Sequence, residues 1–289
     1  MPDIIDVSFQ CGGAAQALAA AGVKTVIRYY SRDTGLPAKR LTRAEAGQLA
    51  AAGLTIGAVH EARHGDRLAS FSQDLGRLDG AYARTYAAAT IGQPAGSAIY
   101  FAVDFDAAAG EIAGAVVPYF RGVAQALAAP TGEPAYEVGV YGSGATCAAV
   151  LDAQLATRAW LCQSTGWSGY DAFDQSGRWA LKQGLPAKVA EVACDPDQAS
   201  AAAVIGDFTP AAAQLPASAA PLLQVIARSG AHLRAGPGTD FASLALLPYG
   251  ADVRLLKTQD GWTLVDLHGD GKADGFVSAP LLASATDQQ

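Results

Sequence analysis

Short apolar runs alternate with longer alanine-rich stretches over residues 1–208. The runs have the length of buried strands, and the stretches between them carry apolar residues at helical spacing. Polar residues stand at the carboxyl end of most runs. We predict strands at 4–8, 25–30, 54–59, 97–103, 138–142, 159–161, 179–182 and 189–193.

Helices are expected between most of these strands, at about 14–21, 42–52, 69–89, 112–128 and 147–155. Thr42 and Glu45 have the spacing of a capping box, which predicts the start of the second helix. Strands that alternate with helices favour a parallel sheet. Eight such units predict an α/β fold, a closed (β/α)8 TIM-type barrel whose late helices are shortened or missing. Its length lies near the lower limit of about 200 residues for this fold.

An open doubly wound sheet is the alternative fold. No Gly-x-Gly-x-x-Gly follows the first strand, so nothing supports a dinucleotide site, and no cofactor is expected. In a barrel, the residues at the carboxyl ends of the strands line the active site. The polar residues near those ends are Asp6, Arg28, Tyr29, Glu61, Asp104, Asp106, Tyr141, Gln183 and Asp195.

Asp104 and Asp106 end the apolar run that begins at Ile99. Side chains alternate along a strand, so this spacing predicts two carboxylates on the same side, roughly 7 Å apart. Cleavage of a glycosidic bond needs such a pair, one carboxyl protonated and one ionised. A surface turn or a helix cap is the alternative interpretation of aspartates at a strand end.

Residues 3–208 resemble the glycoside-hydrolase-like barrels related to family-25 lysozymes, which cut peptidoglycan between muramic acid and glucosamine. The resemblance rests on blocks that occur in family order at 6–8, 26–30, 100–106, 139–141, 179–183 and 192–197. It implies a muramidase-like hydrolase acting on peptidoglycan or a related polysaccharide. In that family pattern Asp106 would be the general acid, Asp104 and Asp6 would stabilise positive charge on the sugar, and Asp195 would hold substrate or water.

The chain departs from this family pattern at the fourth strand. The lysozymes carry Asp-x-Glu there, whereas Asp106 is one methylene shorter. A shift of about 1 Å in a catalytic group can cost about a hundredfold in rate. Three alternatives stay open: the site has closed up around Asp106, Glu61 supplies the acid from the neighbouring strand, or catalysis has been lost. The alternative function is therefore a catalytically inactive, glycan-binding barrel at the cell wall.

Other residues near the predicted mouth have two interpretations each. Arg28 is either a counter-charge among the acids or a salt-bridge partner. Tyr29, Tyr141 and Trp167 could stack on sugar rings, and Gln183 is a candidate for substrate binding. For Trp179, in contrast, a place in the core is favoured.

No metal site is expected from the histidines or the cysteines. His60 and His64 flank Glu61, but they lack the spacing of a His-Glu-x-x-His site. Cys11, Cys147, Cys162 and Cys194 show no metal or redox spacing and are interpreted as buried thiols.

A proline- and alanine-rich segment at 209–221 predicts a linker. Short strand-like runs follow it from 222 to 282. They resemble a bacterial SH3 domain, on the segments 233–241, 247–250, 261–262 and 275–281. Such a domain implies binding to peptide or glycan parts of peptidoglycan.

The composition narrows the set of partners. The net charge of −7 argues against nucleic acid and anionic membranes, which would repel the chain. No apolar stretch reaches the roughly 18 residues that span a bilayer. We expect action at the cell wall, in the periplasm or outside the cell. No secretory signal is visible at the N-terminus, so the expected export route is phage lysis or specialised secretion. The oligomeric state stays open.

Overall fold

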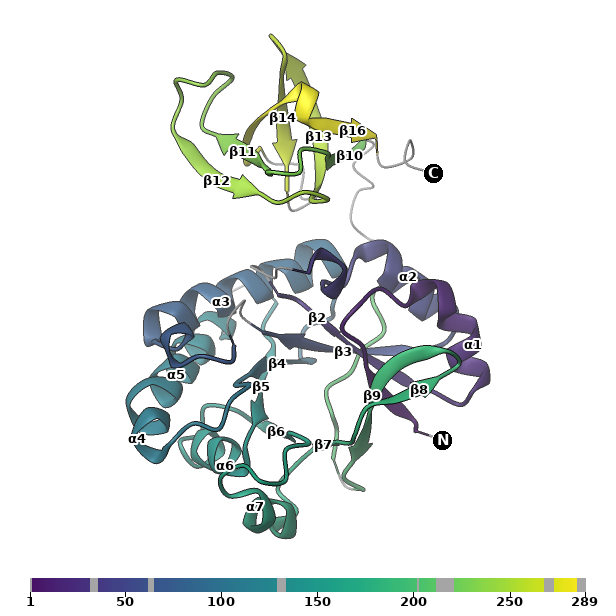
Figure 1. The fold of residues 1–289 in the computed structure, drawn as a ribbon, viewed down its shortest axis with the longest axis vertical. Helices are drawn as coiled ribbons and strands as arrows, with labels where there is room; N and C mark the ends of the chain where they lie inside the picture. The colour runs from purple at the N-terminus through teal and green to yellow at the C-terminus, as the bar shows by residue number, and fades with distance from the viewer. Residues whose placement is uncertain are drawn as a thin grey trace. The chain divides into compact units, whose positions relative to one another are not determined.

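The computed structural model describes residues 2–31, 36–61, 65–128, 134–201, 203–211, 221–267 and 273–284. The chain divides into two compact units, Met1–Ala211 and Ala212–Gln289 (Figure 1). Most of the linker predicted at 209–221 lies outside the described residues.

The first unit alternates strands and helices, as the sequence pattern predicts. Its strands are β1 (Ile4–Asp6), β2 (Thr25–Tyr29), β3 (Thr55–His60), β4 (Ala98–Ala102), β5 (Glu137–Gly142), β6 (Arg158–Leu161), β7 (Leu181–Gln183), β8 (Ala187–Val189) and β9 (Val192–Ala199). Its helices are α1 (Ala15–Ala20), α2 (Arg43–Ala51), α3 (Gln73–Thr85), α4 (Ala109–Glu111), α5 (Val117–Leu127), α6 (Gly144–Asp152) and α7 (Tyr170–Ser176).

Short turns of other helix types extend several of these helices. The 3₁₀ turns are Gly12–Ala14, Pro37–Lys39 and Leu68–Ser70, and the π-helical turns are Tyr86–Ile91 and Ile112–Val116. Among the helices of the described part of the chain, none has the length and apolar character needed to cross a membrane.

The strands form a closed eight-stranded barrel, with the helices around its outside (Figure 1). Strands β1 to β7 pair in parallel and in chain order, which confirms the predicted barrel. The eighth barrel strand differs, because β9 runs antiparallel to both β7 and β1. The connection at 184–191 is too short for a crossover helix, and it forms a hairpin through β8 instead.

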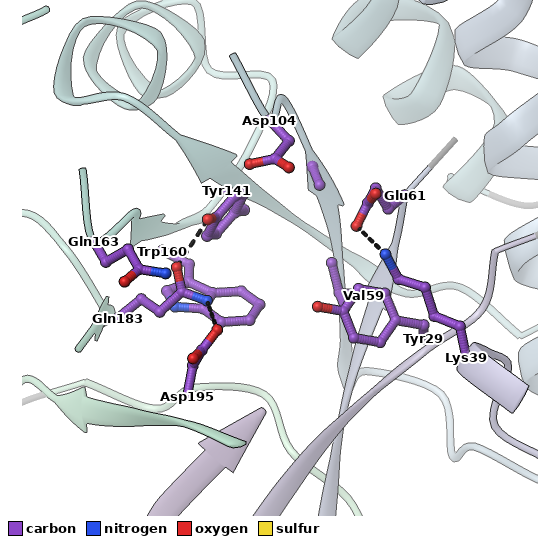
Figure 2. Close-up of a pocket in the computed structure, with 11 residues that line it drawn as sticks. Tyr29, Lys39, Val59, Glu61, Asp104, Tyr141, Trp160, Gln163, Gln183 and Asp195 are labelled. Carbon is purple, nitrogen blue, oxygen red and sulfur yellow. Dashed lines mark hydrogen bonds and ion pairs between the residues drawn. The ribbon is translucent and has the colours of Figure 1, made fainter. Parts of the chain in front are cut away.

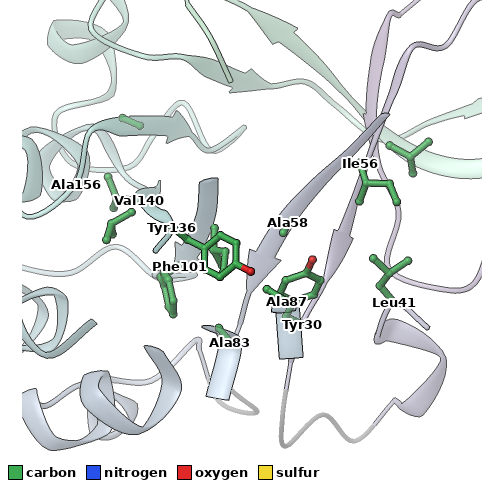
Figure 3. Packing of buried hydrophobic residues seen from close by; sticks show 14 of the residues in the cluster. Tyr30, Leu41, Ile56, Ala58, Ala83, Ala87, Phe101, Tyr136, Val140 and Ala156 are labelled. Atoms are coloured by element: carbon green, nitrogen blue, oxygen red, sulfur yellow. The ribbon is translucent and has the colours of Figure 1, made fainter. Parts of the chain in front are cut away.

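Hydrophobic layers cover both the outer and the inner face of the barrel wall. The larger layer lies between the strands and the helices and includes Tyr30, Ile56 and Phe101 (Figure 3). The smaller layer fills the inside of the barrel. Ile205 belongs to this inner layer, and its carbonyl accepts a hydrogen bond from the Tyr100 hydroxyl at 2.8 Å. The segment after β9 therefore contributes to the filling of the barrel.

A buried ion pair joins β2 to α2. The Arg28 guanidinium donates to both carboxylate oxygens of Glu45, at 2.9 Å and 3.0 Å, and both side chains are almost fully buried. It also donates to the backbone carbonyls of Ala38 and Lys39, at 3.2 Å and 3.0 Å, and to that of Val7. This one side chain thus ties β1, β2, α2 and the segment before α2 together.

The same ion pair explains a difference at the start of α2. The Thr42 side chain accepts from the Glu45 backbone, as the predicted helix start requires. The Glu45 carboxylate turns inward to Arg28 and to the backbone N–H of Cys11, at 2.8 Å. A buried guanidinium needs a carboxylate partner, so Glu45 serves it rather than completing a capping box.

The second unit is a strand-rich, SH3-like β-structure, as predicted. Its strands are β10 (Leu222–Val225), β11 (Ala231–Arg234), β12 (Ser243–Leu247), β13 (Asp252–Gln259), β14 (Trp262–Asp266), β15 (Gly275–Ser278) and β16 (Leu282–Ser284). All pairings between them are antiparallel, in the order β12-β11-β15-β14-β13-β10-β16. The core contains alternating inward residues such as Val253, Val265 and Val277.

Loss of the Arg28 guanidinium should destabilise the barrel strongly. We expect Arg28→Met to lower the free energy of unfolding by about 3–5 kcal/mol, because it leaves the buried Glu45 carboxylate unpaired. Urea denaturation checks this value. The double variant Arg28→Met/Glu45→Leu is the control, and it should be less destabilised because neither charge remains. A loss below 1 kcal/mol for the single variant would contradict the structural role.

Candidate functional site

A pocket with a volume of about 190 Å³ opens at the carboxyl ends of the barrel strands (Figure 2). Loops and strand ends from both halves of the barrel contribute to it. Its lining residues are Tyr29, Lys39, Val59, Glu61, Ala102, Asp104, Tyr141, Trp160, Gln163, Gln183 and Asp195. The pocket therefore lies where the barrel fold places active sites.

Three acidic side chains reach the pocket from different strands of the barrel. Glu61 follows β3, Asp104 follows β4, and Asp195 belongs to β9 (Figure 2). The protein around Asp104 excludes part of the solvent and raises the pKa of its carboxyl, and the nearby charge of Glu61 raises it further. Partial burial likewise raises the pKa of Asp195. Two pocket acids are thus biased toward their protonated forms.

Lys39 brings a positive charge into the same pocket. Its ammonium forms an ion pair with Glu61 at 2.7 Å and lies 4.3 Å from the centre of the Tyr29 ring. Both side chains of the pair are mostly buried. Lys39 was not among the predicted site residues, because it lies in the segment between β2 and α2, away from any strand end.

A hydrogen-bonded network connects the pocket to Asp6 on β1. Gln183 donates to Asp6 at 2.8 Å and to Asp195 at 3.4 Å, and its carbonyl oxygen accepts from Tyr141 at 2.8 Å. The Tyr29 hydroxyl donates to Asp6 at 3.2 Å. Burial raises the pKa of Asp6 to about 7, and Asp195 adds to this, while the hydrogen bonds from Gln183 and Tyr29 counteract part of it.

An aromatic residue and a further carboxyl complete this network. Trp160 is buried, lines the pocket, and packs edge-on against Tyr141 with ring centres 4.8 Å apart. Its indole N–H donates to Asp197 at 2.7 Å. Burial, with the charge of Asp6, raises the pKa of Asp197 well above its usual range. Sequence analysis placed Trp160 in a strand, and the alternation of β6 was the available signal that it faces inward.

The structure brings together most of the predicted site residues. Those that line the pocket are Tyr29, Glu61, Asp104, Tyr141, Gln183 and Asp195. Asp6 is buried and bonded to two of them. Arg28 does not line the pocket, since its guanidinium is fully buried against Glu45, which is the salt-bridge alternative.

Asp106 and Trp167 also lie apart from the pocket lining. β4 ends at Ala102, so the strand alternation that predicts a common side for Asp104 and Asp106 does not continue to them. Asp104 lines the pocket, whereas the Asp106 carboxylate accepts hydrogen bonds from Ser168. Trp167 is half-buried in the loop that contains Ser168. Trp179 packs against the outer hydrophobic layer, in accordance with its predicted place in the core.

Among the described residues, none of the predicted histidines and cysteines lines the pocket. His60 is buried, with its Nε2 atom 3.5 Å from Asp79, and His64 lies outside the described residues. All four cysteines are free and buried. Within the described ranges, no group of three or more histidine, cysteine or acidic side chains could hold a metal ion.

Two family models match the chain. Residues 16–206 match the Rv2525c-like, glycoside hydrolase-like domain, and residues 229–283 match the bacterial SH3 domain. Among curated proteins, 177 residues (58% of the chain) are 35% identical to the uncharacterized protein YbfG of Bacillus subtilis. A further 29% identity over 171 residues (58% of the chain) links it to the uncharacterized protein FadG of the same organism. The matches span only 24% and 29% of these two relatives.

The barrel is similar to several solved structures. The Mycobacterium tuberculosis Tat-secreted protein Rv2525c, in complex with L-tartrate, gives a TM-score of 0.57 at 22% identity, over 68% of this chain and 94% of that one. The bacterial lysozyme from Streptomyces coelicolor gives a TM-score of 0.43 at 16% identity, over 69% and 92% of the two chains.

The family models account for both units and confirm the two resemblances found in the sequence. The match at 16–206 covers most of the barrel, including the strands that carry the pocket acids. The chain therefore belongs to the Rv2525c-like, glycoside hydrolase-like domain family and carries a bacterial SH3 domain after that domain.

Proposed function

We propose that the barrel is a glycoside hydrolase that cuts a polysaccharide of the bacterial cell wall. The observation that carries this proposal is the pair of carboxyl groups, Asp104 and Glu61, that face one pocket from neighbouring strands (Figure 2). Glycosidases need two carboxyl groups in different protonation states beside the scissile bond. The surroundings of Asp104 raise its pKa, whereas Glu61 forms an ion pair with Lys39.

Asp104 is the proposed general acid. Its pKa is raised by partial exclusion of solvent and by the charge of Glu61, and this shift favours the protonated form that a general acid needs. Glu61 accepts from Lys39 as a carboxylate, which suits a group that stabilises or attacks the sugar. Asp195 would orient the sugar hydroxyls or a water molecule, and Asp6 would hold Gln183 in place. In this assignment Asp106 is not the acid.

The pocket supports a small, hydroxyl-rich substrate unit. Its volume of about 190 Å³ is below the roughly 300–1,000 Å³ typical of pockets for drug-sized ligands, so it suits about one sugar ring. Tyr29, Tyr141 and Trp160 supply aromatic surface, and Gln163 and Gln183 supply amide groups. The related Rv2525c was solved with L-tartrate, a hydroxylated compound. This supports a polar ligand here.

The cell wall as the place of action is supported by the second unit and by a relative. A bacterial SH3 domain follows the barrel, and Rv2525c is a Tat-secreted protein. We therefore extend the proposal to a wall polysaccharide such as peptidoglycan, which the SH3 unit would hold near the barrel. The SH3 unit then contributes affinity, and the barrel contributes turnover.

A glycan-binding barrel without turnover is the second candidate function. It is favoured by the aspartate at position 106, where the lysozymes that the sequence resembles carry glutamate. Both functions predict binding of a glycan, so binding by itself does not separate them. Release of new reducing ends does.

Removal of either reacting carboxyl should slow hydrolysis strongly. On purified peptidoglycan, we expect the wild type to release new reducing ends, with the products identified by mass spectrometry. Asp104→Asn and Glu61→Gln should each lower the rate by about 10²–10⁴-fold, because a proton donor or a charged partner is lost. Asp171→Asn, at an exposed site on α7, is the matched control and should keep the wild-type rate.

Two outcomes would contradict this proposal. If walls of several compositions bind but release no reducing ends, the barrel is a binding module. If hydrolysis occurs and Asp104→Asn keeps the wild-type rate, the proposed acid is wrong.

The stability of the barrel should depend on pH through Asp6. The folded state holds the Asp6 proton up to a pKa of about 7, whereas an unfolded aspartate loses it near pH 3.9. The contribution of this group to stability is therefore complete below about pH 4 and is lost as the pH rises toward 7. Between pH 5 and 7, the free energy of unfolding of the wild type should fall relative to Asp6→Asn, on the order of 1 kcal/mol per pH unit.

Urea unfolding of both proteins at pH 5, 6, 7 and 8 checks this expectation. Asp104, Asp195 and Asp197 are present in both proteins, so the difference between the two curves reports Asp6 together with its electrostatic effect on Asp195 and Asp197. Parallel curves over the whole range would show that Asp6 is ionised in the folded state and would contradict the expectation.

A further inference from the structure

The Asp106 carboxylate is exposed, yet both of its oxygens are engaged by one residue. Oδ1 accepts from the backbone N–H of Ser168 at 2.9 Å, and Oδ2 accepts from the Ser168 hydroxyl at 3.1 Å. This double contact joins the segment after β4 to the loop between β6 and α7. It connects residues 62 positions apart in the chain.

The loop that Ser168 belongs to also packs against the start of α6. The Ser168 carbonyl accepts from the Ala145 backbone N–H at 2.8 Å. A Cβ atom added to Gly144 would lie 2.2 Å from the carbonyl oxygen of Gly169, so the two backbones approach as closely as glycine permits. Gly169 itself has a positive φ of 74°, which glycine adopts readily. The loop is therefore held from two sides, by α6 and by Asp106.

The start of this loop, at Gln163, forms part of the pocket lining. Gln163 lines the pocket (Figure 2), and Trp167 lies one turn further along, where its backbone N–H donates to the Ser164 carbonyl at 3.0 Å. Ser168 and Gln163 belong to the same short loop, whose middle is closed by this backbone hydrogen bond. The Asp106 contact is thus connected to the pocket through the backbone at 163–168.

We propose that Asp106 is a positioning residue, which anchors the loop at 163–169 and thereby fixes the Gln163 wall of the substrate pocket. This inference rests on the proposed function for its kinetic readout. It gives Asp106 a different task from that of the glutamate in the lysozymes that the sequence resembles. The shorter aspartate side chain reaches both donors of Ser168 and leaves the proton transfer to Asp104.

Substitution by asparagine separates positioning from acid catalysis. An asparagine at this position can accept from the Ser168 N–H through its carbonyl oxygen and donate to the Ser168 hydroxyl through its amide nitrogen. It cannot give a proton to a leaving group. Asparagine therefore preserves an anchor and destroys an acid, whereas alanine destroys both.

The experiment compares Asp106→Asn, Asp106→Ala and Ser168→Ala in the full chain, with Asp171→Ala on α7 as the exposed control. We expect Asp106→Asn to keep kcat and KM within about threefold of the wild type. Asp106→Ala should raise KM about tenfold with little change in kcat, the size expected for the loss of one or two hydrogen bonds. Ser168→Ala should raise KM in the same direction by a smaller factor.

A second readout is independent of turnover. Acrylamide quenching of tryptophan fluorescence, corrected with the same variants in a Trp167→Phe background, reports how well the loop is held. Quenching of Trp167 should increase in Asp106→Ala and stay at the wild-type level in Asp106→Asn. This readout tests the anchor even if no glycan is hydrolysed, so failure of the proposed function and failure of this inference are distinguishable.

Two results would overturn the inference. A loss of kcat of a hundredfold or more in Asp106→Asn, with unchanged Trp167 quenching, would make Asp106 a catalytic acid. Unchanged quenching in both Asp106→Ala and Ser168→Ala would show that the contact does not hold the loop.

Discussion

The closure of the barrel by an antiparallel β9 is the constraint on which the candidate site depends. This strand lies between β7 and β1, so its register places Asp195 opposite Asp6 and Asp197 opposite Gln183. Carboxyl groups from distant parts of the chain meet there in a largely dry environment. Their proximity would be unfavourable if all were ionised, and protonation together with amide and indole donors resolves the conflict.

As a consequence of this arrangement, the two sides of the barrel interior differ in character. The side of β7, β9 and β1 holds a hydrogen-bonded, partly protonated network, whereas the side of β3 and β4 presents Glu61 and Asp104 to the pocket. Trp160 and Tyr141 lie between the two sides and connect them.

Much of this could be predicted from the sequence, and the exceptions have physical causes. Runs that end in polar residues identified seven of the eight barrel strands and five residues of the pocket, because strand ends in a barrel converge. The eighth predicted strand, 189–193, was wrong, because it covers the turn between β8 and β9. The hydrophobic periodicity cannot show the direction of β9, because that direction depends on how the connection at 184–191 folds. Lys39 enters the pocket from a segment without a regular pattern. The inward turn of Glu45 depends on a buried arginine from another element.

The hydrogen bonds from Arg28 to the carbonyls of Ala38 and Lys39 have a consequence beyond the strength of the fold. They hold the backbone of Lys39, whose ammonium pairs with Glu61 in the pocket. Arg28, which is buried on the outer side of the barrel wall, thereby affects the electrostatics inside the barrel. An inherited change in the outer packing could then alter the reactivity of the pocket while every lining residue stays the same. Divergence of activity among barrels of this kind can in this way begin at positions that never meet a substrate.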